Sequence, residues 1–339
     1  MSKFIYRICF FLPLLIVFSS SLSYAQLLWE VSGKNSKQKS YLFGTVHVGD
    51  KRVIDYASNV YPYMDNSLTV AGELDLNVMT SIMAMAYIMS PKDSTLSKLL
   101  TKEEYQEIKP YLVENIGELA PFLDMVRPVF VMAMLQEKEQ EKLAGANEEN
   151  ATTQKFPPLD MHLQNRARRN DQNVMGLETV KEQMTALNST PIDKQAKELY
   201  NYIKAKSEQT DSKNTVGDIE MTTKNDTTAL DFKKNPMETL ISLYLTENIE
   251  LLHDQISKEF EEETYQSLIV KRNLVMVKRM EEQMNKKPSK EDRKSKKNII
   301  FAAVGAGHLG GEKGMVNLLK EAGYTLKPIF FNKKQETEK

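Results

Sequence analysis

Two histidines of this 339-residue sequence follow the same short pattern, in which an apolar run is followed by a glycine, two small or medium residues and then the histidine. Residues 41–47 (YLFGTVH) contain the first copy and residues 301–308 (FAAVGAGH) the second. The chain has only four histidines and one cysteine, so imidazole or thiol chemistry can come from few positions. Imidazole serves proteins both as a metal ligand and as a general acid or base. The repeated pattern therefore singles out His47 and His308.

Carboxylates follow two further apolar runs in a similar way. Glu73 lies near the end of the run at residues 68–74, and Glu178 ends the run at residues 173–178. Two imidazoles and one carboxylate are typical of a catalytic divalent metal that keeps an open position for water. We therefore expect His47, Glu73 and His308 to bind a metal that activates water and polarises a carbonyl.

Simpler interpretations of these residues stay open. A histidine after a strand can be an ordinary turn residue, and Glu178 can be an acidic residue at a helix N-terminus. The other two histidines, His162 and His253, lack the preceding strand and glycine. We expect them to be structural or exposed.

The elements that position these residues are predicted from hydrophobic runs and their boundaries. Strands are expected at residues 27–31, 40–46, 68–74, 298–304 and 324–331, and helices at 78–89, 101–113, after 128, through much of 179–285 and at 314–322. The sequence thus predicts an α/β fold, with a mixed central sheet built from N- and C-terminal strands and a large helical middle region. If the strands before the two motif histidines are parallel, their carboxyl ends meet at one edge of the sheet.

Three polar stretches, at residues 137–155, 208–234 and 285–298, are expected to be solvated loops. The last is rich in lysine and could instead bind a polyanion, but a loose loop beside a core strand is the more ordinary interpretation. Lys+Arg 45 against Asp+Glu 46 gives a net charge of −1, so nucleic-acid binding is not expected. Residues 334–339 are expected to form a charged tail.

The first 25 residues resemble a secretory signal peptide. Lys3 and Arg7 precede an apolar run at residues 8–18, and small residues lead to Ala25. The run is shorter than the roughly 20 residues that span a bilayer, so a membrane anchor is less favoured. We expect cleavage near Ala25, which would remove Cys9, the only cysteine, and deliver a periplasmic or extracellular protein without a transmembrane segment.

Six short segments, taken together and in this order, resemble the TraB/GumN family, which is related to the Tiki proteins. They are residues 28–33 (LWEVSG), 40–47 (SYLFGTVH), 73–75 (ELD), 176–183 (GLETVKEQ), 271–273 (KRN) and 304–311 (VGAGHLGG). The resemblance extends from about residue 27 to 331 and implies one TraB/GumN-like domain over residues 26–333. It also implies a Tiki-like α/β fold with both histidine motifs, an acidic residue and an arginine at one site.

The resemblance implies a function as well. Tiki proteins are divalent-metal-dependent proteases, and TraB and PrgY relatives restrain a peptide pheromone. By position His47 and His308 match the motif histidines, Glu73 the acidic residue and Arg272 the arginine. The first hypothesis is a secreted hydrolase acting on a peptide or protein, with Mn, Co or Zn at His47, Glu73 and His308. Glu178 or Glu73 would be the general base, and Arg272 would orient substrate or stabilise an oxyanion.

The second hypothesis is a non-catalytic protein that sequesters a peptide or polysaccharide in the same cleft. The sequence gives no prediction for the oligomeric state, the metal or the bond cleaved.

Overall fold

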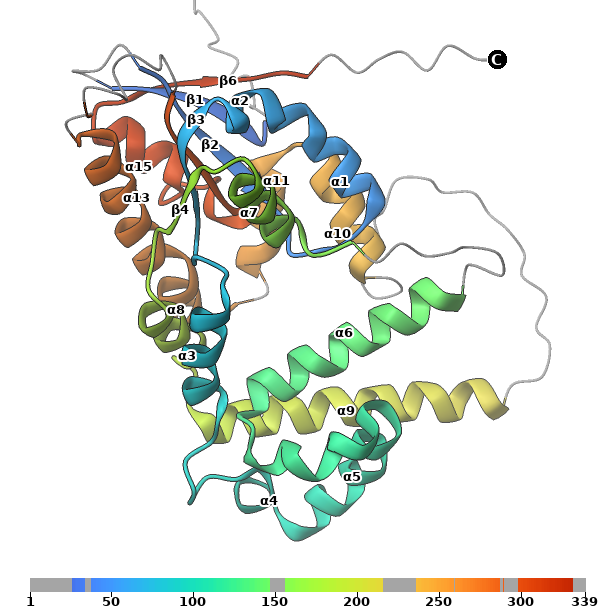
Figure 1. Cartoon of the computed structure of the whole chain (residues 1–339). Coiled ribbons are helices and arrows are strands. Elements are labelled where there is room, and N and C mark those ends of the chain that lie inside the picture. The colour runs from blue at the N-terminus through green and yellow to red at the C-terminus, as the bar shows by residue number, and fades with distance from the viewer. Residues whose placement is uncertain are drawn as a thin grey trace, which may run out of the picture.

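The computed structural model describes residues 26–33, 38–146, 156–215, 236–258, 260–286, 289 and 298–331. A six-stranded mixed sheet with the spatial order β4-β3-β5-β2-β1-β6 forms its centre (Figure 1). The strands are β1 (Leu28–Ser32), β2 (Ser40–Thr45), β3 (Ser67–Gly72), β4 (Asn173–Gly176), β5 (Asn298–Gly305) and β6 (Thr325–Pro328). The predicted α/β fold, with a sheet drawn from both ends of the chain, is confirmed.

Four adjacent strands of the sheet run parallel. β5 pairs in parallel with β2 on one side and with β3 on the other, and β3 pairs in parallel with β4. β1 is antiparallel to both β2 and β6. β5 is central, as its continuous apolar run predicts, and residues 300–304 are buried because the strand is covered on both faces. The carboxyl ends of β4, β3, β5 and β2 therefore lie along one edge of the sheet.

Helices cover both faces of the sheet and share one hydrophobic core with it. In Figure 1, α13 (Lys271–Met284) and α15 (Met315–Glu321) lie on one side, and α1 (Lys51–Ala57), α7 (Leu159–Arg169) and α10 (Pro236–Leu245) on the other. Shorter or connecting elements are the 3₁₀ helix η1 (Ser58–Val60), α2 (Tyr61–Asp65), α11 (Ile249–Lys258), α12 (Glu262–Tyr265), the π-helix η3 (Gln266–Val270) and the 3₁₀ helix η4 (Ala306–His308).

A group of helices with its own core lies apart from the sheet (Figure 1). It consists of α4 (Leu96–Leu99), α5 (Lys102–Ile116), the 3₁₀ helix η2 (Gly117–Met125), α6 (Pro128–Ala146) and α9 (Ile192–Thr215). α5 begins at the capping box expected from the sequence, in which the Thr101 side chain accepts from the backbone N–H of Glu104. α3 (Val78–Ile88) and α8 (Val180–Leu187) lie between this group and the sheet.

The expectation that residues 137–155 and 208–234 are loops is wrong for their first parts. α6 continues to Ala146 and α9 to Thr215. The segment at residues 137–142 consists of Glu, Lys and Gln, which favour helices. Glu139 of α6 shows the link, because it accepts from Tyr111 of α5 at 2.8 Å and from Lys206 of α9 at 2.7 Å.

Several expectations concern residues outside those described. These are the signal peptide at 1–25, the tail at 334–339, the remainders of the two polar stretches at 147–155 and 216–234, and most of the basic stretch at 285–298. Within the described ranges, no helix combines the length and apolar character needed to cross a bilayer.

Candidate functional site

The four residues expected at strand ends follow adjacent strands in the order of the sheet. Glu178 follows β4, Glu73 follows β3, His308 follows β5 and His47 follows β2. Because these strands are parallel, the residues gather at one edge although 261 positions separate the two histidines along the sequence. Arg272 reaches the same edge from α13.

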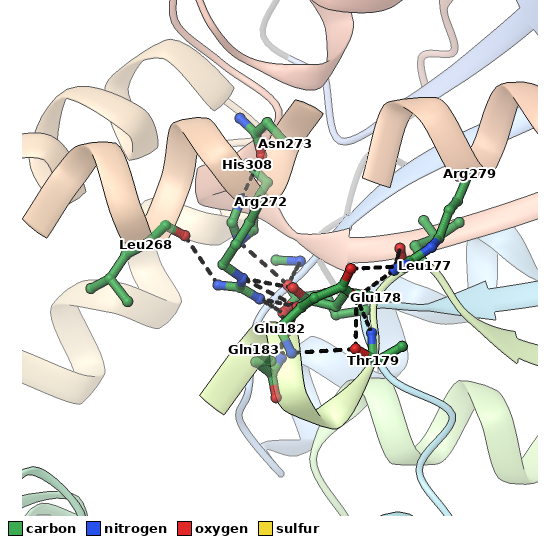
Figure 2. A network of polar contacts seen from close by, with 12 residues as sticks. Leu177, Glu178, Thr179, Glu182, Gln183, Leu268, Arg272, Asn273, Arg279 and His308 are labelled. Carbon is green, nitrogen blue, oxygen red and sulfur yellow. Dashed lines mark hydrogen bonds and ion pairs between the residues drawn. The ribbon is translucent and has the colours of Figure 1, made fainter. Parts of the chain in front are cut away.

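Glu73, Glu178 and Arg272 form the most closely connected part of the cluster, of which Figure 2 labels Glu178 and Arg272. Arg272 Nη2 lies 2.6 Å from Glu73 Oε2 and 2.5 Å from Glu178 Oε1, and its Nε lies 3.1 Å from both carboxylate oxygens of Glu178. Gln183 Nε2 donates to both carboxylates, at 3.2 Å and 3.1 Å. One guanidinium thus binds two carboxylates whose side chains are only 8% and 0% exposed.

The backbone brings the two carboxylates together. The pairing of β3 with β4 continues past the strand ends, because Leu177 N donates to Gly72 O at 2.8 Å and Glu178 N donates to Glu73 O at 2.9 Å. Gly305, at the end of β5, donates its N–H to Glu73 Oε1 at 2.7 Å. A Cβ at position 305 would lie 3.1 Å from that oxygen, so glycine permits this close approach.

Arg272 lies at the start of α13, directly after the π-helix η3. Its Nη1 donates to the carbonyl of Leu268 in η3 at 3.1 Å, so the wide turn supplies a third anchor for the guanidinium. These contacts use four of the five N–H donors of the side chain. The arginine is therefore mainly a counter-cation for the two glutamates, and only one N–H on Nη1 remains for another partner.

His308 is held by the residue that follows Arg272. Its Nδ1 lies 2.7 Å from Asn273 Oδ1, and Asn273 Nδ2 donates to Lys313 O at 2.8 Å. Because an amide oxygen only accepts, Nδ1 of His308 carries the proton and Nε2 keeps its lone pair. That Nε2 faces Glu73 Oε1 at 3.7 Å.

His47 has a comparable arrangement. Its Nδ1 lies 2.7 Å from Oδ2 of Asp160, a buried carboxylate at the start of α7, while the imidazole itself is largely exposed. The other carboxylate oxygen of Asp160 accepts from the hydroxyl of Thr45, the last residue of β2. Both motif histidines thus have Nδ1 within 2.7 Å of a buried oxygen.

The charges of the cluster follow from burial and from these contacts. Burial alone would raise the pKa of Glu73, but the imidazole of His308 and the guanidinium of Arg272 lower it to about 2. Burial lowers the pKa of His308 to about 4, so this imidazole is neutral at pH 7. The nearby Asp160 carboxylate raises the pKa of His47 to about 9. Burial raises the pKa of Glu178, although Arg272 opposes that shift.

His47, Glu73 and His308 supply the ligand types that a divalent metal needs. No group of three or more His, Asp or Glu side chains among the described residues already has metal-binding spacing. The donor chemistry nevertheless fits, because metal-binding histidines commonly donate one ring N–H to a carboxylate or carbonyl oxygen and bind through the other nitrogen. His308 meets this condition, because its Nδ1 is held by Asn273 and its Nε2 faces Glu73. His47 would have to lose a proton first, as ligands do when a metal binds.

Three residues of this cluster were missed by reasoning from the sequence: Asp160, Asn273 and Gln183. Asn273 and Gln183 lie within the segments that carry the family resemblance, and Asn273 directly follows Arg272, but neither has a distinguishing pattern of its own. Asp160 follows two prolines at the start of a helix, which predicts an N-terminal acidic residue and nothing more.

The remaining two histidines are structural, within the expectation. His162 Nε2 pairs with the Tyr61 hydroxyl at 2.8 Å, and the two rings stack. His253 is buried between Gly307 O and the Tyr265 hydroxyl, each 3.3 Å from a ring nitrogen. It therefore supports the turn that carries His308.

A cavity of about 740 Å³ adjoins the cluster. Glu178 and Arg272 lie on its wall, and α8 and the η3–α13 segment form its sides. Beside it, Arg279 of α13 binds Glu182 of α8 through two contacts of 2.7 Å and 2.9 Å (Figure 2). This ion pair is more exposed than that of Arg272, and it fixes α8 against α13 at the cavity.

Comparison with known proteins was made on the whole chain. The model of the TraB/PrgY/gumN family matches residues 27–328. Metalloprotease TIKI homolog of Amphimedon queenslandica is 24% identical, covering 88% of this chain and 60% of the relative. Metalloprotease TIKI2 of Danio rerio is 24% identical with the same coverages, and metalloprotease TIKI1 of Xenopus tropicalis is 26% identical, covering 84% and 58%.

This chain spans about 60% of the length of the curated relatives that it matches. No solved structure matches it significantly. The family match covers the described strands and the residues of the cluster. The chain therefore belongs to the TraB/PrgY/gumN family.

Proposed function

We propose that this protein is a divalent-metal-dependent hydrolase that cleaves peptide bonds, with His47, Glu73 and His308 as metal ligands. The observation that carries the proposal is the shared orientation of the two motif histidines. Asp160 and Asn273 each have an oxygen 2.7 Å from Nδ1 of an imidazole, so a metal would bind at its Nε2. A lone turn histidine would not require such a buried acceptor. Two histidines that are each held in this way at one sheet edge are typical of a metal site.

The bound metal, which we propose to be Mn, Co or Zn, would lower the pKa of a water molecule and polarise the substrate carbonyl. The residues of the chain carry out the remaining proton transfers. In the hydrolysis a water oxygen bonds to the carbonyl carbon, a carboxylate accepts the water proton, the C–N bond breaks and the proton passes to the leaving amine. Glu178 is the better candidate for this acceptor, since Glu73 is assigned to the metal.

Arg272 has a narrower role in this proposal than direct recognition of substrate. Four of its donors bind Glu73, Glu178 and Leu268, so it sets the position of both carboxylates. Its remaining Nη1 donor could bind one oxygen of a substrate or an oxyanion. The family relationship supports a protease function, because the curated relatives are named metalloproteases.

Metal analysis combined with a cleavage assay tests the proposal. The purified protein is dialysed, its metal content is measured by mass spectrometry, and a peptide library is incubated with and without added Mn²⁺, Co²⁺ or Zn²⁺. We expect stoichiometric metal, cleavage that chelation abolishes, and loss of both in His308→Ala. His162→Ala is the matched control, since it removes an imidazole outside the cluster.

Other outcomes would overturn the proposal. Metal content and peptide cleavage that are unchanged in His47→Ala and His308→Ala would exclude this site. Retained metal and peptide binding without any cleavage would favour the alternative function, sequestration of a peptide or polysaccharide.

We also propose that the protein is exported and cleaved near Ala25, on the signal-peptide pattern of residues 1–25. N-terminal sequencing of the protein recovered from the extracytoplasmic fraction tests this. An intact Met1 in that fraction would contradict it.

A further inference from the structure

α3 presents an apolar face that the rest of the described structure leaves uncovered. None of its residues is buried, and Val78, Met79 and Met85 are 77%, 63% and 63% exposed. The 3.6-residue repeat aligns Val78, Ile82 and Met85 along one stripe of α3, and Met89 follows directly after the helix. Helices of this apolar character normally lie in a protein interior, so this face needs a partner.

The opposite side of α3 is packed. Ala84 and Tyr87 contact a small cluster formed by Leu74 and by Val180 and Met184 of α8. The N-terminus is fixed by a capping box between Asn77 and Thr80. The exposed side is therefore held in place as a surface of a well-anchored helix.

A second apolar stripe begins next to the C-terminal end of α3. A 3₁₀ helix has three residues per turn, so Leu119, Phe122 and Met125 of η2 lie above one another, and all three are exposed. The stripes meet where Ser90 N donates to Met125 O at 2.8 Å and Met89 pairs with Val126. We call the combined set the α3–η2 surface: Val78, Met79, Ile82, Met83, Met85, Met89, Leu119, Phe122 and Met125.

The α3–η2 surface holds nine of the fourteen large apolar side chains that are exposed among the described residues. Scattered apolar residues on a surface are ordinary, but a concentration of them on adjoining elements marks an interaction site. A stable protein–protein contact buries about 800 Å² on each partner, and nine large side chains can form the centre of such an area.

We propose that the α3–η2 surface is an interface between two copies of this chain, related by a two-fold axis. No charged residue lies between Asp75 and Lys92, so α3 offers nothing that would select a charged peptide or an anionic lipid headgroup. η2 carries two acidic residues: Glu118 is exposed, and Asp124 is bound to Ser97 N and Oγ at 2.7 Å and 3.0 Å. The uncharged apolar stripe of α3 is complementary to itself, as a two-fold interface requires, and flexible methionines adapt to one another.

The interface would lie near the candidate site without including it. α3 packs on α8, and α8 carries Gln183, which binds both Glu73 and Glu178. The proposal does not depend on the hydrolase function.

Sedimentation equilibrium tests the proposal on protein expressed from the full 339-residue sequence and purified as the cell processes it. We expect a dimer, and we expect Ile82→Glu combined with Met85→Glu to weaken dimerisation at least about a hundredfold, because two buried centres become charged. Leu251→Glu is the matched control: Leu251 is 45% exposed on α11, outside the surface, and its variant should remain dimeric. Circular dichroism checks that the variants are folded.

Cross-linking gives a second, independent measurement. Cys9 is the only native thiol, so a Cys9→Ser background with Ile82→Cys can form a disulfide only between two copies. Oxidation should give a covalent dimer with Ile82→Cys and not with Leu251→Cys. A wild-type monomer at all accessible concentrations would overturn the proposal, as would a dimer unaffected by the glutamates or a monomer that binds uncharged lipid vesicles through these residues.

Discussion

Replacing Arg272 by Met should remove the positive charge that Glu73 and Glu178 share, while keeping a side chain of similar length. The three side chains are 11%, 8% and 0% exposed, so solvent cannot replace the guanidinium. Removing one partner of a buried ion pair costs about 3–5 kcal/mol, because a charge is left buried without compensation. The variant should lose that much of its free energy of unfolding at pH 7.

The loss should depend on pH in a defined direction. In the wild type, Glu73 has a lowered pKa, so its stabilisation is present above pH 4.5 and is lost as the pH falls toward about 2. Without Arg272 two adjacent carboxylates cannot both remain ionised, so one takes up a proton and its pKa in the folded state rises above that of the unfolded chain. The folded variant then binds more protons than its unfolded form and regains stability as the pH is lowered. The difference between Arg272→Met and wild type should therefore shrink from pH 7 to pH 5.

Urea denaturation of chelator-treated protein, followed by circular dichroism at several pH values, measures this prediction. Arg279→Met is the control on the same helix, and its more exposed ion pair with Glu182 should lower stability by at most about 1 kcal/mol. Adding Glu178→Gln to Arg272→Met removes one uncompensated charge, so the double variant should be more stable than Arg272→Met. The reasoning is refuted if Arg272→Met loses no more stability than Arg279→Met, or if the second substitution adds a further full loss.

Three further substitutions test individual contacts. Asn273→Ala leaves Nδ1–H of His308 without its acceptor, so the free energy of unfolding should fall by about 1–3 kcal/mol. The tautomer signal of this imidazole in ¹⁵N NMR should also change, and an unchanged tautomer would show that the amide does not orient the ring. Gly72→Ala places a Cβ 2.3 Å from Gln164 Nε2, which is bound to a backbone carbonyl, so urea denaturation should show a loss of about 1–3 kcal/mol; a neutral effect would mean that the glutamine moves freely. Glu182→Gln should lower the free energy of unfolding by at most about 1 kcal/mol at pH 7, because the ion pair is partly exposed. The pKa of this carboxyl is lowered to about 2, so the difference in stability from wild type should disappear as the pH falls from 4.5 toward 2. A difference that persists at pH 2 would contradict the assigned charge.

Local patterns in the sequence predicted the central strand of the sheet and the two motif histidines. The apolar run at residues 298–304 predicts a strand buried on both faces, and β5 is central. The glycine and histidine after two such runs select His47 and His308, because strand ends in a parallel sheet project into a shared crevice. Arg272 required the family resemblance, since a lone arginine in a helix has no local signal that separates it from an ordinary surface charge.

The sequence pattern did not predict that α6 and α9 continue into the polar stretches. The charged residues at 137–146 and 208–215 have the composition of solvated loops, yet they form the ends of α6 and α9. The described contact between Glu139 of α6 and Lys206 of α9 links the two helices, and the Glu, Lys and Gln residues at 137–142 have high intrinsic helix propensity. Composition alone does not reveal a packing partner that lies 67 residues away.

The sequence by itself therefore determined the fold class, the family and most of the residues at the candidate site, because these depend on hydrophobic periodicity and on short motifs. Only the tertiary structure decided what each residue contacts. It assigns Arg272 to two glutamates at once, Asn273 to His308 and Asp160 to His47. The reason is physical: burial makes each of these charges and donors require a specific partner, and which partner lies within reach is set by how distant segments pack.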